Sequence, residues 1–191
     1  MEKEKLIIIE GPQGVGKTTL TNWLREKIAY TNLYRLTGNK YTDENAAKSR
    51  SKKMYTNLIS YIDMLEDCGV NLLFDRIFIS ELVYCRLGIR TYNYDNIAKK
   101  LIKRLDLVDF DIYILNLKLN DTNLYFERTK RDKPSHHNVN FGIESSIQQQ
   151  NMYTEIMNEI KNLTENITVV DLYTDDFDKA KEQLTKLLNI I

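Results

Sequence analysis

One stretch near the N-terminus constrains this chain more than any other. Residues 11–19 read Gly-Pro-Gln-Gly-Val-Gly-Lys-Thr-Thr, which fits a glycine, four residues and then Gly-Lys-Ser/Thr. An apolar run of the length of a buried strand precedes it at 6–9, and apolar residues at helical spacing follow it over 20–28. A glycine-rich turn between a strand and a helix lets backbone N–H groups surround a phosphate at the positive end of the helix dipole. The chain is therefore predicted to bind a nucleotide.

The motif also predicts the roles of individual residues. Lys17 is expected to reach the β- and γ-phosphates of ATP, and the hydroxyl of Thr18 is expected to hold Mg²⁺. An ordinary glycine turn is the alternative, which the strand and the helix on either side disfavour. The ATP-binding residues predicted here are Gly11, Gln13, Gly14, Val15, Gly16, Lys17, Thr18 and Thr19.

Composition and charge narrow the class of partner. Lys+Arg and Asp+Glu both number 27, and the zero net charge argues against a broad basic face for a nucleic acid polymer. The apolar run at 6–9 is too short for a signal peptide or a membrane span, so no membrane partner is expected. Cys68 and Cys85 lack metal or redox spacing and are expected to be reduced thiols in a cytoplasmic protein.

Helices and strands alternate along the rest of the chain. Because most strands are continuous apolar runs, they predict a parallel sheet covered on both faces, in one three-layer α/β domain over 1–191. The polar residues 39–51 show no clear period and are expected to include a mobile stretch at the mouth of the site. The predicted strands are 6–9, 32–38, 70–74, 110–116 and 167–171, and the helices centre on 20–28, 54–65, 78–84, 97–105, 122–131, 153–160 and 180–188.

A second part of the site is predicted at the end of the strand 70–74. Leu72-Leu73-Phe74-Asp75 has the form of an apolar strand that ends in a carboxylate, as a Walker B element does. Because ligands bind beyond the carboxyl ends of parallel strands, Asp75 is expected to orient the Mg²⁺ that Thr18 holds. The alternative is an Asp that caps the following helix.

Arg76 follows directly and indicates more than generic ATP binding. A cation beside the γ-phosphate can clamp a second phosphate and neutralise the transferring group. The alternative for Arg76 is a surface ion pair with Asp75 or Glu81. Ser80, Glu81 and Tyr84 lie about one turn apart on the following helix and are expected to line a substrate pocket, although each is also an ordinary helix residue.

Residues 127–134 form a local basic patch, Glu-Arg-Thr-Lys-Arg-Asp-Lys-Pro, ahead of the polar stretch 138–142. A basic helix end that runs into a flexible stretch can close over phosphates and exclude water. A solvated surface loop is the alternative. The adjacent His136 and His137 have no further ligands at metal-binding spacing, so they do not predict a metal site.

Together these residues make the chain resemble the thymidylate kinase and deoxynucleoside kinase group of P-loop kinases. The motifs that carry the resemblance are Glu10-Gly11, Gly16-Lys17-Thr18-Thr19, Asp75-Arg76 with Ser80 and Tyr84, and 128–131 with Glu144 and Tyr153. The resemblance implies a P-loop kinase fold with a five-stranded parallel sheet and transfer of the γ-phosphoryl group of ATP, with Mg²⁺, to a nucleoside or nucleoside monophosphate. Homodimers are common in this group.

The resemblance also implies roles for individual arginines. Arg76 would contact the phosphate or 5′ end of the acceptor and would be catalytic together with Lys17 and Asp75. Residues 127–143 would form a lid, in which Arg128 binds ATP and Arg131 stabilises the transferring group.

Two departures from the group bear on the acceptor. Thymidylate kinases usually carry Asp in the loop where this chain has Gln13. Deoxynucleoside kinases usually place a Glu base just after the second strand, where this chain reads Leu36-Thr37-Gly38-Asn39, with Asp43 and Glu44 further on. A monophosphate is already ionised and needs no base, so the sequence favours a nucleoside monophosphate kinase.

Other classes of function remain open at this point. A deoxynucleoside kinase is the nearest alternative, a kinase for an unrelated small alcohol is a second, and a P-loop protein that regulates a partner without phosphorylating a small molecule is a third. A GTPase switch is disfavoured because residues 74–78 lack the switch glycine, and residues 39–43 have the wrong spacing for guanine recognition.

Overall fold

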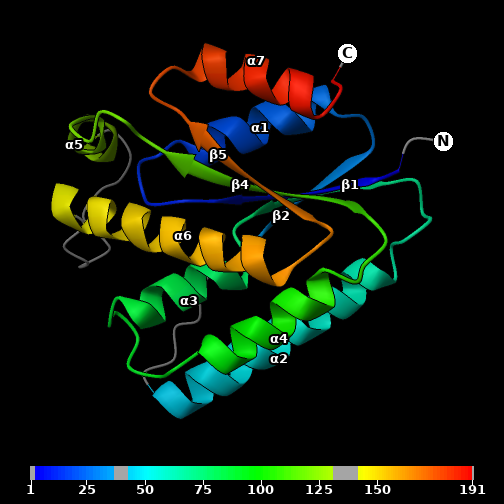
Figure 1. The fold of residues 1–191 in the computed structure, drawn as a ribbon, viewed down its shortest axis with the longest axis horizontal. Coiled ribbons are helices and arrows are strands. Elements are labelled where there is room, and N and C mark those ends of the chain that lie inside the picture. Colours follow the sequence, from blue (N-terminus) through cyan, green and yellow to red (C-terminus); the bar gives the residue numbers. More distant parts are fainter. Residues whose placement is uncertain (1–2, 37–42, 131–141, 191) are drawn as a thin grey trace.

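Five parallel strands form the centre of the protein, in the order β2-β3-β1-β4-β5 (Figure 1). The structure is a computed structural model that describes residues 3–36, 43–130 and 142–190. Its elements are β1 Lys5–Glu10, α1 Lys17–Lys27, β2 Thr31–Arg35, α2 Glu44–Asp63, β3 Asn71–Asp75, α3 Phe78–Arg86, α4 Asp95–Leu105, β4 Asp111–Lys118, α5 Leu124–Lys130, α6 Ile143–Leu163, β5 Ile167–Tyr173 and α7 Phe177–Leu187.

Helices cover both faces of the sheet, which confirms the predicted three-layer α/β architecture. Helices α1 and α7 lie on one face, and α3 and α6 lie on the other with α2 and α4 beyond them (Figure 1). In β1, Leu6 and Ile8 belong to the apolar core on the α3 and α6 side, whereas Ile7 and Ile9 belong to the core on the α1 and α7 side. Residues 6–9 in the middle of β1 are buried on both faces, which explains their continuous apolar run.

The register of the strands gathers their carboxyl ends at one edge of the sheet. Ile9 of β1 lies opposite Asp75 of β3, and Asp75 lies opposite Arg35 of β2. On the other side of β1, Glu10 lies opposite Asn116 of β4. Three neighbouring strands therefore end in charged residues, Arg35, Asp75 and Glu10, at the same edge of the sheet.

The prediction of an irregular stretch over 39–51 is wrong for its second part. Helix α2 begins at Glu44, and the carboxylate of Asp43 caps it by accepting the backbone N–H of Ala46 at 2.6 Å. The buried face of this first part carries the small residues Ala47 and Ser51. Apolar periodicity misses a helix whose core face is made of small and polar side chains. Residues 39–42 lie outside the described residues.

Other boundaries differ by smaller amounts. Strand β2 ends at Arg35, three residues before the predicted end at 38. Helix α6 begins at Ile143, well ahead of the apolar face that starts at Tyr153, because its first part buries the polar residues Ser146 and Gln149. The remaining predicted strands and helices are present, with ends shifted by a few residues.

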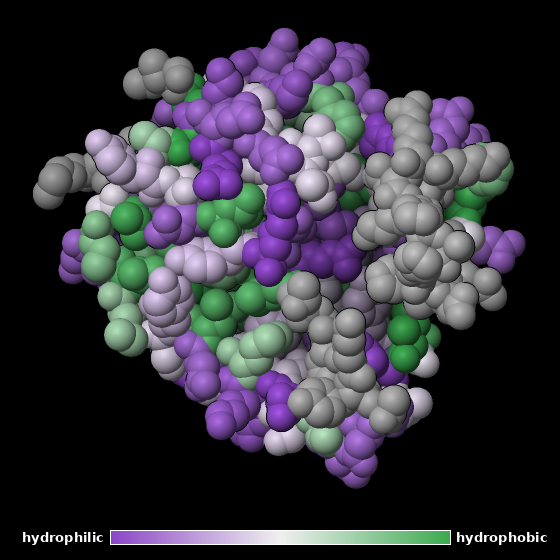
Figure 2. Space-filling view, turned by 180° about the vertical axis from the view of Figure 1, so that it is seen from behind, coloured by the Kyte–Doolittle hydropathy of each residue, from purple (hydrophilic) through white to green (hydrophobic). Residues whose placement is uncertain are grey.

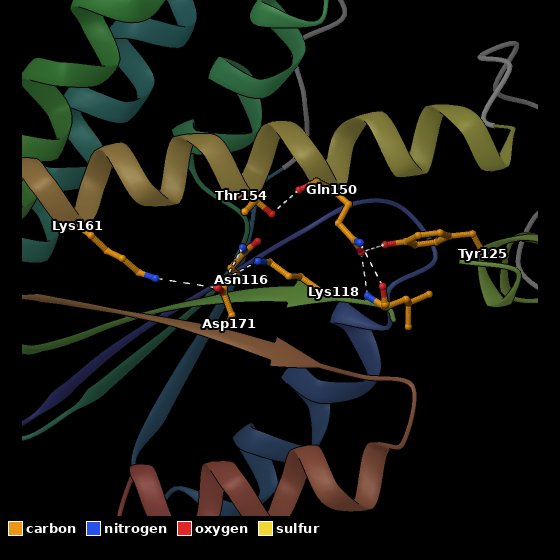
Figure 3. Close-up of polar contacts among 8 residues, drawn as sticks. Asn116, Lys118, Tyr125, Gln150, Thr154, Lys161 and Asp171 are labelled. Atoms are coloured by element: carbon orange, nitrogen blue, oxygen red, sulfur yellow. Dashed lines mark hydrogen bonds and ion pairs between the residues drawn. The ribbon is translucent and has the colours of Figure 1, made fainter. Parts of the chain in front are cut away.

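A polar contact anchors α6 to the sheet and to α5 (Figure 3). The side-chain amide of Gln150 bonds both backbone groups of Leu119: its Oε1 accepts from the N–H at 2.8 Å and its Nε2 donates to the C=O at 3.1 Å. The same Oε1 accepts the hydroxyl of Tyr125 on α5 at 2.6 Å. Nearby, Asp171 of β5 pairs with Lys118 of β4 at 3.0 Å. Residues 119–125 and α6 are therefore held together at the carboxyl edge of the sheet.

The outer surface is mixed in polarity. On the face seen in Figure 2, hydrophilic side chains gather over the upper part and around a hollow near the centre. The large apolar side chains that are most exposed, Tyr30, Met64 and Leu107, come from separate connections. Within the described part of the chain, no helix is long and apolar enough to cross a membrane. Cys68 and Cys85 are free, Cys68 at the surface and Cys85 half-buried.

Candidate active site

The loop between β1 and α1 has the backbone geometry that phosphate binding requires. Gly11, Gly14 and Gly16 all have positive φ, at 142°, 80° and 97°. A Cβ on Gly11 would lie 2.7 Å from the carbonyl oxygen of Leu117, and a Cβ on Gly16 would lie 2.2 Å from the ring of Phe177. Glycine is therefore needed at these two positions both for the conformation and for the close packing of the loop on β4 and on the start of α7.

Lys17 opens α1 directly behind the loop and lies across it. Its side chain is buried, and its ammonium group donates to the carbonyl oxygens of Gly11 at 2.9 Å and Pro12 at 2.5 Å. These bonds hold the positive charge over the concave side of the loop. A lysine in this place can turn from two carbonyl oxygens to phosphate oxygens, which are stronger acceptors because they are charged.

A cavity of about 710 Å³ lies in front of the loop. Its volume falls within the range of roughly 300–1,000 Å³ that is common for small-molecule sites. Most of the residues predicted for the site line it, whereas Gly11 and Val15 form the loop behind it. The lining residues are Gln13, Gly14, Gly16, Lys17, Thr18, Thr19, Arg35, Leu36, Asp75, Arg76, Arg128 and Phe177.

Asp75 and Thr18 line this cavity together, and their oxygen atoms are the kind that Mg²⁺ prefers. The carboxylate of Asp75 lies 3.4 Å from the Nε of Arg35, and the Nη2 of Arg35 donates to the Oδ1 of Asn22 at 2.6 Å. In the described stretches of the chain, no group of three or more His, Cys, Asp or Glu side chains could hold a metal ion. A magnesium ion at Thr18 and Asp75 would therefore depend on phosphate oxygens and water for the rest of its ligands.

Arg76 is held at the cavity in a strained backbone conformation. Its φ is 72°, its N–H donates to the carbonyl oxygen of Ile9 at 3.0 Å, and its guanidinium donates to the hydroxyl of Tyr84 at 2.6 Å. A positive φ at a residue other than glycine costs free energy and is common at functional sites. In the described residues the ion pairs of Asp75 and Glu81 run to Arg35 and Arg90, and not to Arg76.

Ser80 and Glu81 are buried beside the cavity and do not line it. The hydroxyl of Ser80 donates to Glu10 at 2.7 Å and lies 2.8 Å from the hydroxyl of Tyr153. The carboxylate of Glu81 accepts the hydroxyl of Tyr92. Of the residues predicted for a substrate pocket, Tyr84 is the one in direct contact with Arg76. Their roles toward an acceptor stay predictions.

Arg128, predicted in the lid, connects α5 to the glycine-rich loop. Its guanidinium donates to the carbonyl oxygens of Thr174 at 2.8 Å and Val15 at 3.4 Å, and it lies over the ring of Phe177 at 5.2 Å from the ring centre. Its charge is thus fixed at the loop by hydrogen bonds and by a cation–π contact. Arg131 and the pair His136-His137 lie outside the described residues.

The sequence analysis did not assign Arg35 and Phe177, which line the cavity, or Glu10, which is buried at the start of α3. Arg35 ends β2 and therefore lies at the edge of the sheet. The sequence predicted the end of this strand at residue 38, so Arg35 was expected inside the strand. Phe177 packs on Gly16 from the far end of the chain, and no local pattern indicates that contact. Glu10 was noted only as part of a motif, although it is fully buried and bonds to the start of α3. A charged residue at the end of an otherwise apolar strand is the signal that could have identified it.

The glycine loop after β1, the strand order and the cavity at the carboxyl edge define the fold as that of the P-loop kinases. The chain is similar to the solved thymidylate kinase of Candida albicans, with a TM-score of 0.69 and 18% identity over 98% of this chain and 92% of that one. It is also similar to thymidylate kinase from Ehrlichia chaffeensis, with a TM-score of 0.59 and 16% identity over 98% of this chain and 100% of that one.

A deoxyadenosine kinase from M. mycoides, solved with products dCMP and dCDP, matches with a TM-score of 0.56 and 20% identity over 96% of this chain and 98% of that one. No protein-family model matches the chain, and neither does any curated protein sequence. At these low identities the likeness establishes the fold. The resemblance that the sequence motifs predicted is therefore confirmed at the level of the fold.

Proposed function

We propose that this protein transfers the γ-phosphoryl group of Mg-ATP to the phosphate of a nucleoside monophosphate, with residues 1–191 acting as one kinase domain. The observation that carries the proposal is the pair Arg35 and Arg76. Arg35 ends β2 and Arg76 follows the neighbouring parallel strand β3, and both line the same cavity as the glycine-rich loop. They supply cations at the side of the cavity away from α7, where a second phosphate would lie.

The charge of the cavity supports two phosphate-bearing ligands. Among the described lining residues, Lys17, Arg35, Arg76 and Arg128 are cationic and Asp75 is the one acid. Lys17 and Arg128 contact the phosphate loop itself, so they are assigned to ATP. The two strand-end arginines remain for the acceptor. Arginine binds phosphate through a planar fork of donors, which suits recognition of a terminal phosphate.

The acidic residues near the second strand support a monophosphate over a nucleoside. Asp43 caps α2 through the N–H of Ala46, and Glu44 accepts the N–H of Thr91 at 3.2 Å. Neither lines the cavity. A 5′-hydroxyl acceptor needs a base to take its proton, whereas a phosphate oxygen is already ionised at neutral pH.

Catalysis in this proposal consists of positioning and charge stabilisation. Lys17 would move from the loop carbonyl oxygens to the phosphates, and Arg76 would hold the acceptor phosphate in line with the γ-phosphate. Thr18 and Asp75 would hold Mg²⁺, which neutralises charge on the phosphates when bound. Arg131 of the lid is proposed to stabilise the transferring group.

A deoxynucleoside kinase is the second candidate. The likeness to the deoxyadenosine kinase from M. mycoides supports it, with a TM-score of 0.56 over nearly the whole of both chains. A P-loop protein that regulates a partner without a small acceptor is a candidate of another class.

The test is ADP formation from Mg-ATP with a panel of nucleosides and nucleoside monophosphates, both ribo and deoxy, with Lys17→Ala as the inactive control. ADP release that requires one monophosphate is the expected result. Release that requires a nucleoside would replace the proposal with the deoxynucleoside kinase. ATP binding without dependence on any acceptor would contradict both and favour the regulatory protein.

A further inference from the structure

Glu10 is a buried carboxylate that does not line the cavity and has no assigned part in the proposed reaction. It ends β1 on the face of the sheet that α3 and α6 cover, and its side chain is inaccessible to solvent. We propose that Glu10 is a positioning residue, which holds Arg76 at the acceptor side of the cavity through the first turn of α3. The acceptor role of Arg76 rests on the proposed function.

Two hydrogen bonds connect Glu10 to the start of α3. Its Oε1 accepts the backbone N–H of Ile77 at 2.8 Å, and its Oε2 accepts the hydroxyl of Ser80 at 2.7 Å. The N–H of Arg76 donates to the carbonyl oxygen of Ile9 at 3.0 Å. Two consecutive residues after β3 are thus attached to two consecutive residues of β1. Because the φ of Arg76 is 72°, these attachments oppose its return to a relaxed backbone conformation.

Glu10 also places its charge at the start of α3, where the N-cap side chain makes no hydrogen bond. The residue at the N-cap position is Ile77, whose side chain cannot accept a hydrogen bond, and no side chain of the cap residue satisfies the first turn. The carboxylate of Glu10 accepts the N–H of this N-cap residue and the hydroxyl of Ser80 in the first turn, and it places negative charge at the positive end of the helix dipole. The start of α3, and Arg76 directly before it, therefore depend on a residue from another strand.

Charged and titratable groups from several elements face this carboxylate. Arg76 after β3 and Lys17 at the start of α1 favour its ionised form. Tyr55 of α2 and Tyr153 of α6 interact with it electrostatically, and the hydroxyl of Tyr153 lies 2.8 Å from that of Ser80. Because both oxygens of Glu10 are occupied by protein donors, the carboxylate acts on the reaction through Arg76 and not as a base toward the acceptor.

Burial raises the pKa of Glu10 to about 7, although the bonds from Ile77 and Ser80 and the charges of Arg76 and Lys17 act to lower it. The ionised form accepts both hydrogen bonds. The protonated form carries a proton on one oxygen and has to give up or reverse one of them. The position of Arg76 is therefore sensitive to pH near neutrality.

The kinetic test compares Glu10→Gln with Glu165→Gln, a change of the same kind at an exposed carboxylate. In Glu10→Gln the KM for the acceptor should rise roughly 10- to 100-fold with the KM for ATP unchanged, because a small displacement of a positioning group costs that much. The acceptor kcat/KM of the wild type should change near pH 7, and Glu10→Gln should lose that change. Equal increases of both KM values would indicate a merely structural role and overturn the proposal.

A second measurement is independent of activity. The ¹⁵N–¹H resonance of the Ile77 amide should titrate near pH 7 in the wild type and should not do so in Glu10→Gln. A titration that persists in the variant overturns the proposal. If no acceptor supports turnover, the proposed function fails, and this resonance still decides whether Glu10 holds the start of α3.

Ser80→Ala covers the case in which Glu10→Gln does not fold. It removes one of the two hydrogen bonds and leaves the carboxylate in place. The amide resonance of Ile77 should still titrate near pH 7, and the KM for the acceptor should rise by less than it does in Glu10→Gln. An acceptor KM equal to that of the wild type in Ser80→Ala overturns the proposal.

Discussion

Arg35 at the end of β2 and Arg76 directly after β3 are held in different ways. Arg76 is tied through its backbone to Ile9 and through its guanidinium to Tyr84. Arg35 is 46% exposed in its side chain and pairs with Asp75. Because the guanidinium of Arg35 is half-exposed and lies 3.4 Å from Asp75, the ion pair stabilises little, on the order of 0–1 kcal/mol, and Arg35 can leave Asp75 for a phosphate at small cost. Arg76 is thus already held at the cavity, whereas Arg35 is able to move from Asp75 to a bound phosphate.

Removing either arginine should weaken use of the acceptor more than binding of ATP. Arg76→Ala and Arg35→Ala should each raise the KM for the acceptor roughly 10- to 100-fold, because each loses a hydrogen bond to a charged group worth about 1.5–3 kcal/mol. The ATP Kd, measured by calorimetry, should change little. Arg25→Ala, on the exposed side of α1, is the matched control. A collapse of ATP affinity with an unchanged acceptor KM would show that Arg76 is assigned to the wrong ligand.

Among the elements, the glycine-rich loop between β1 and α1 packs against the start of α7. Gly16 has a φ of 97°, and a Cβ there would lie 2.2 Å from the ring of Phe177. Gly69 has a φ of 69° and nothing within 4 Å of such a Cβ. Alanine substitutions at Gly16 and Gly69 therefore both strain the backbone, but only the one at Gly16 also collides with the ring of Phe177.

Gly16→Ala should destabilise the protein by roughly 1–3 kcal/mol more than Gly69→Ala, because only the first adds overpacking to backbone strain. Nucleotide binding should be lost in Gly16→Ala and retained in Gly69→Ala. Urea unfolding and a nucleotide-binding assay on both variants provide the measurement. Equal losses of stability would mean that the contact with Phe177 has no energetic effect.

The contact of Gln150 with Leu119 and Tyr125 gives a second prediction at this scale (Figure 3). Gln150→Ala should cost roughly 1–3 kcal/mol, because it leaves buried or half-buried polar partners without their hydrogen bonds. Hydrogen exchange at the amide of Leu119 should become faster. Gln148→Ala is the control, since Gln148 is exposed on the same helix. Similar effects of the two changes would show that Gln150 does not anchor α6.

For the whole molecule, the buried Glu10 predicts how stability depends on pH. Burial raises its pKa from 4.5 to about 7, so the folded protein holds a proton that the unfolded chain releases over this interval. The free energy of unfolding should therefore fall as the pH rises from about 4.5 through 7. The contribution of this one group is roughly 3 kcal/mol at most, from about 1.4 kcal/mol per pH unit.

Urea unfolding of the wild type and of Glu10→Gln at several pH values between 5 and 8 measures this contribution. The difference in stability between the two proteins should change with pH in favour of the variant as the pH rises. A difference that stays constant across this range would mean that the pKa of Glu10 is not raised in the folded protein.

Patterns with a local physical cause were predicted well. The glycine loop, the buried strands and Asp75 at a strand end were all identified from a few neighbouring residues, because backbone conformation and apolar periodicity are local properties. The start of α2 was missed because its buried residues, Ala47 and Ser51, are small or polar and give no apolar periodicity.

By itself the sequence determined the fold class, because helices alternate with continuous apolar strands along the chain. It also determined the glycine-rich loop, because residues 6–28 specify a strand, a glycine turn and a helix. Only the tertiary structure decided which distant side chains complete the site: Phe177 on Gly16, Arg35 beside Asp75, and Glu10 under the start of α3. Those contacts follow from the order and register of the strands and from the packing of helices on the sheet. Sequence spacing carries no information about either, since Gly16 and Phe177 lie at opposite ends of the chain.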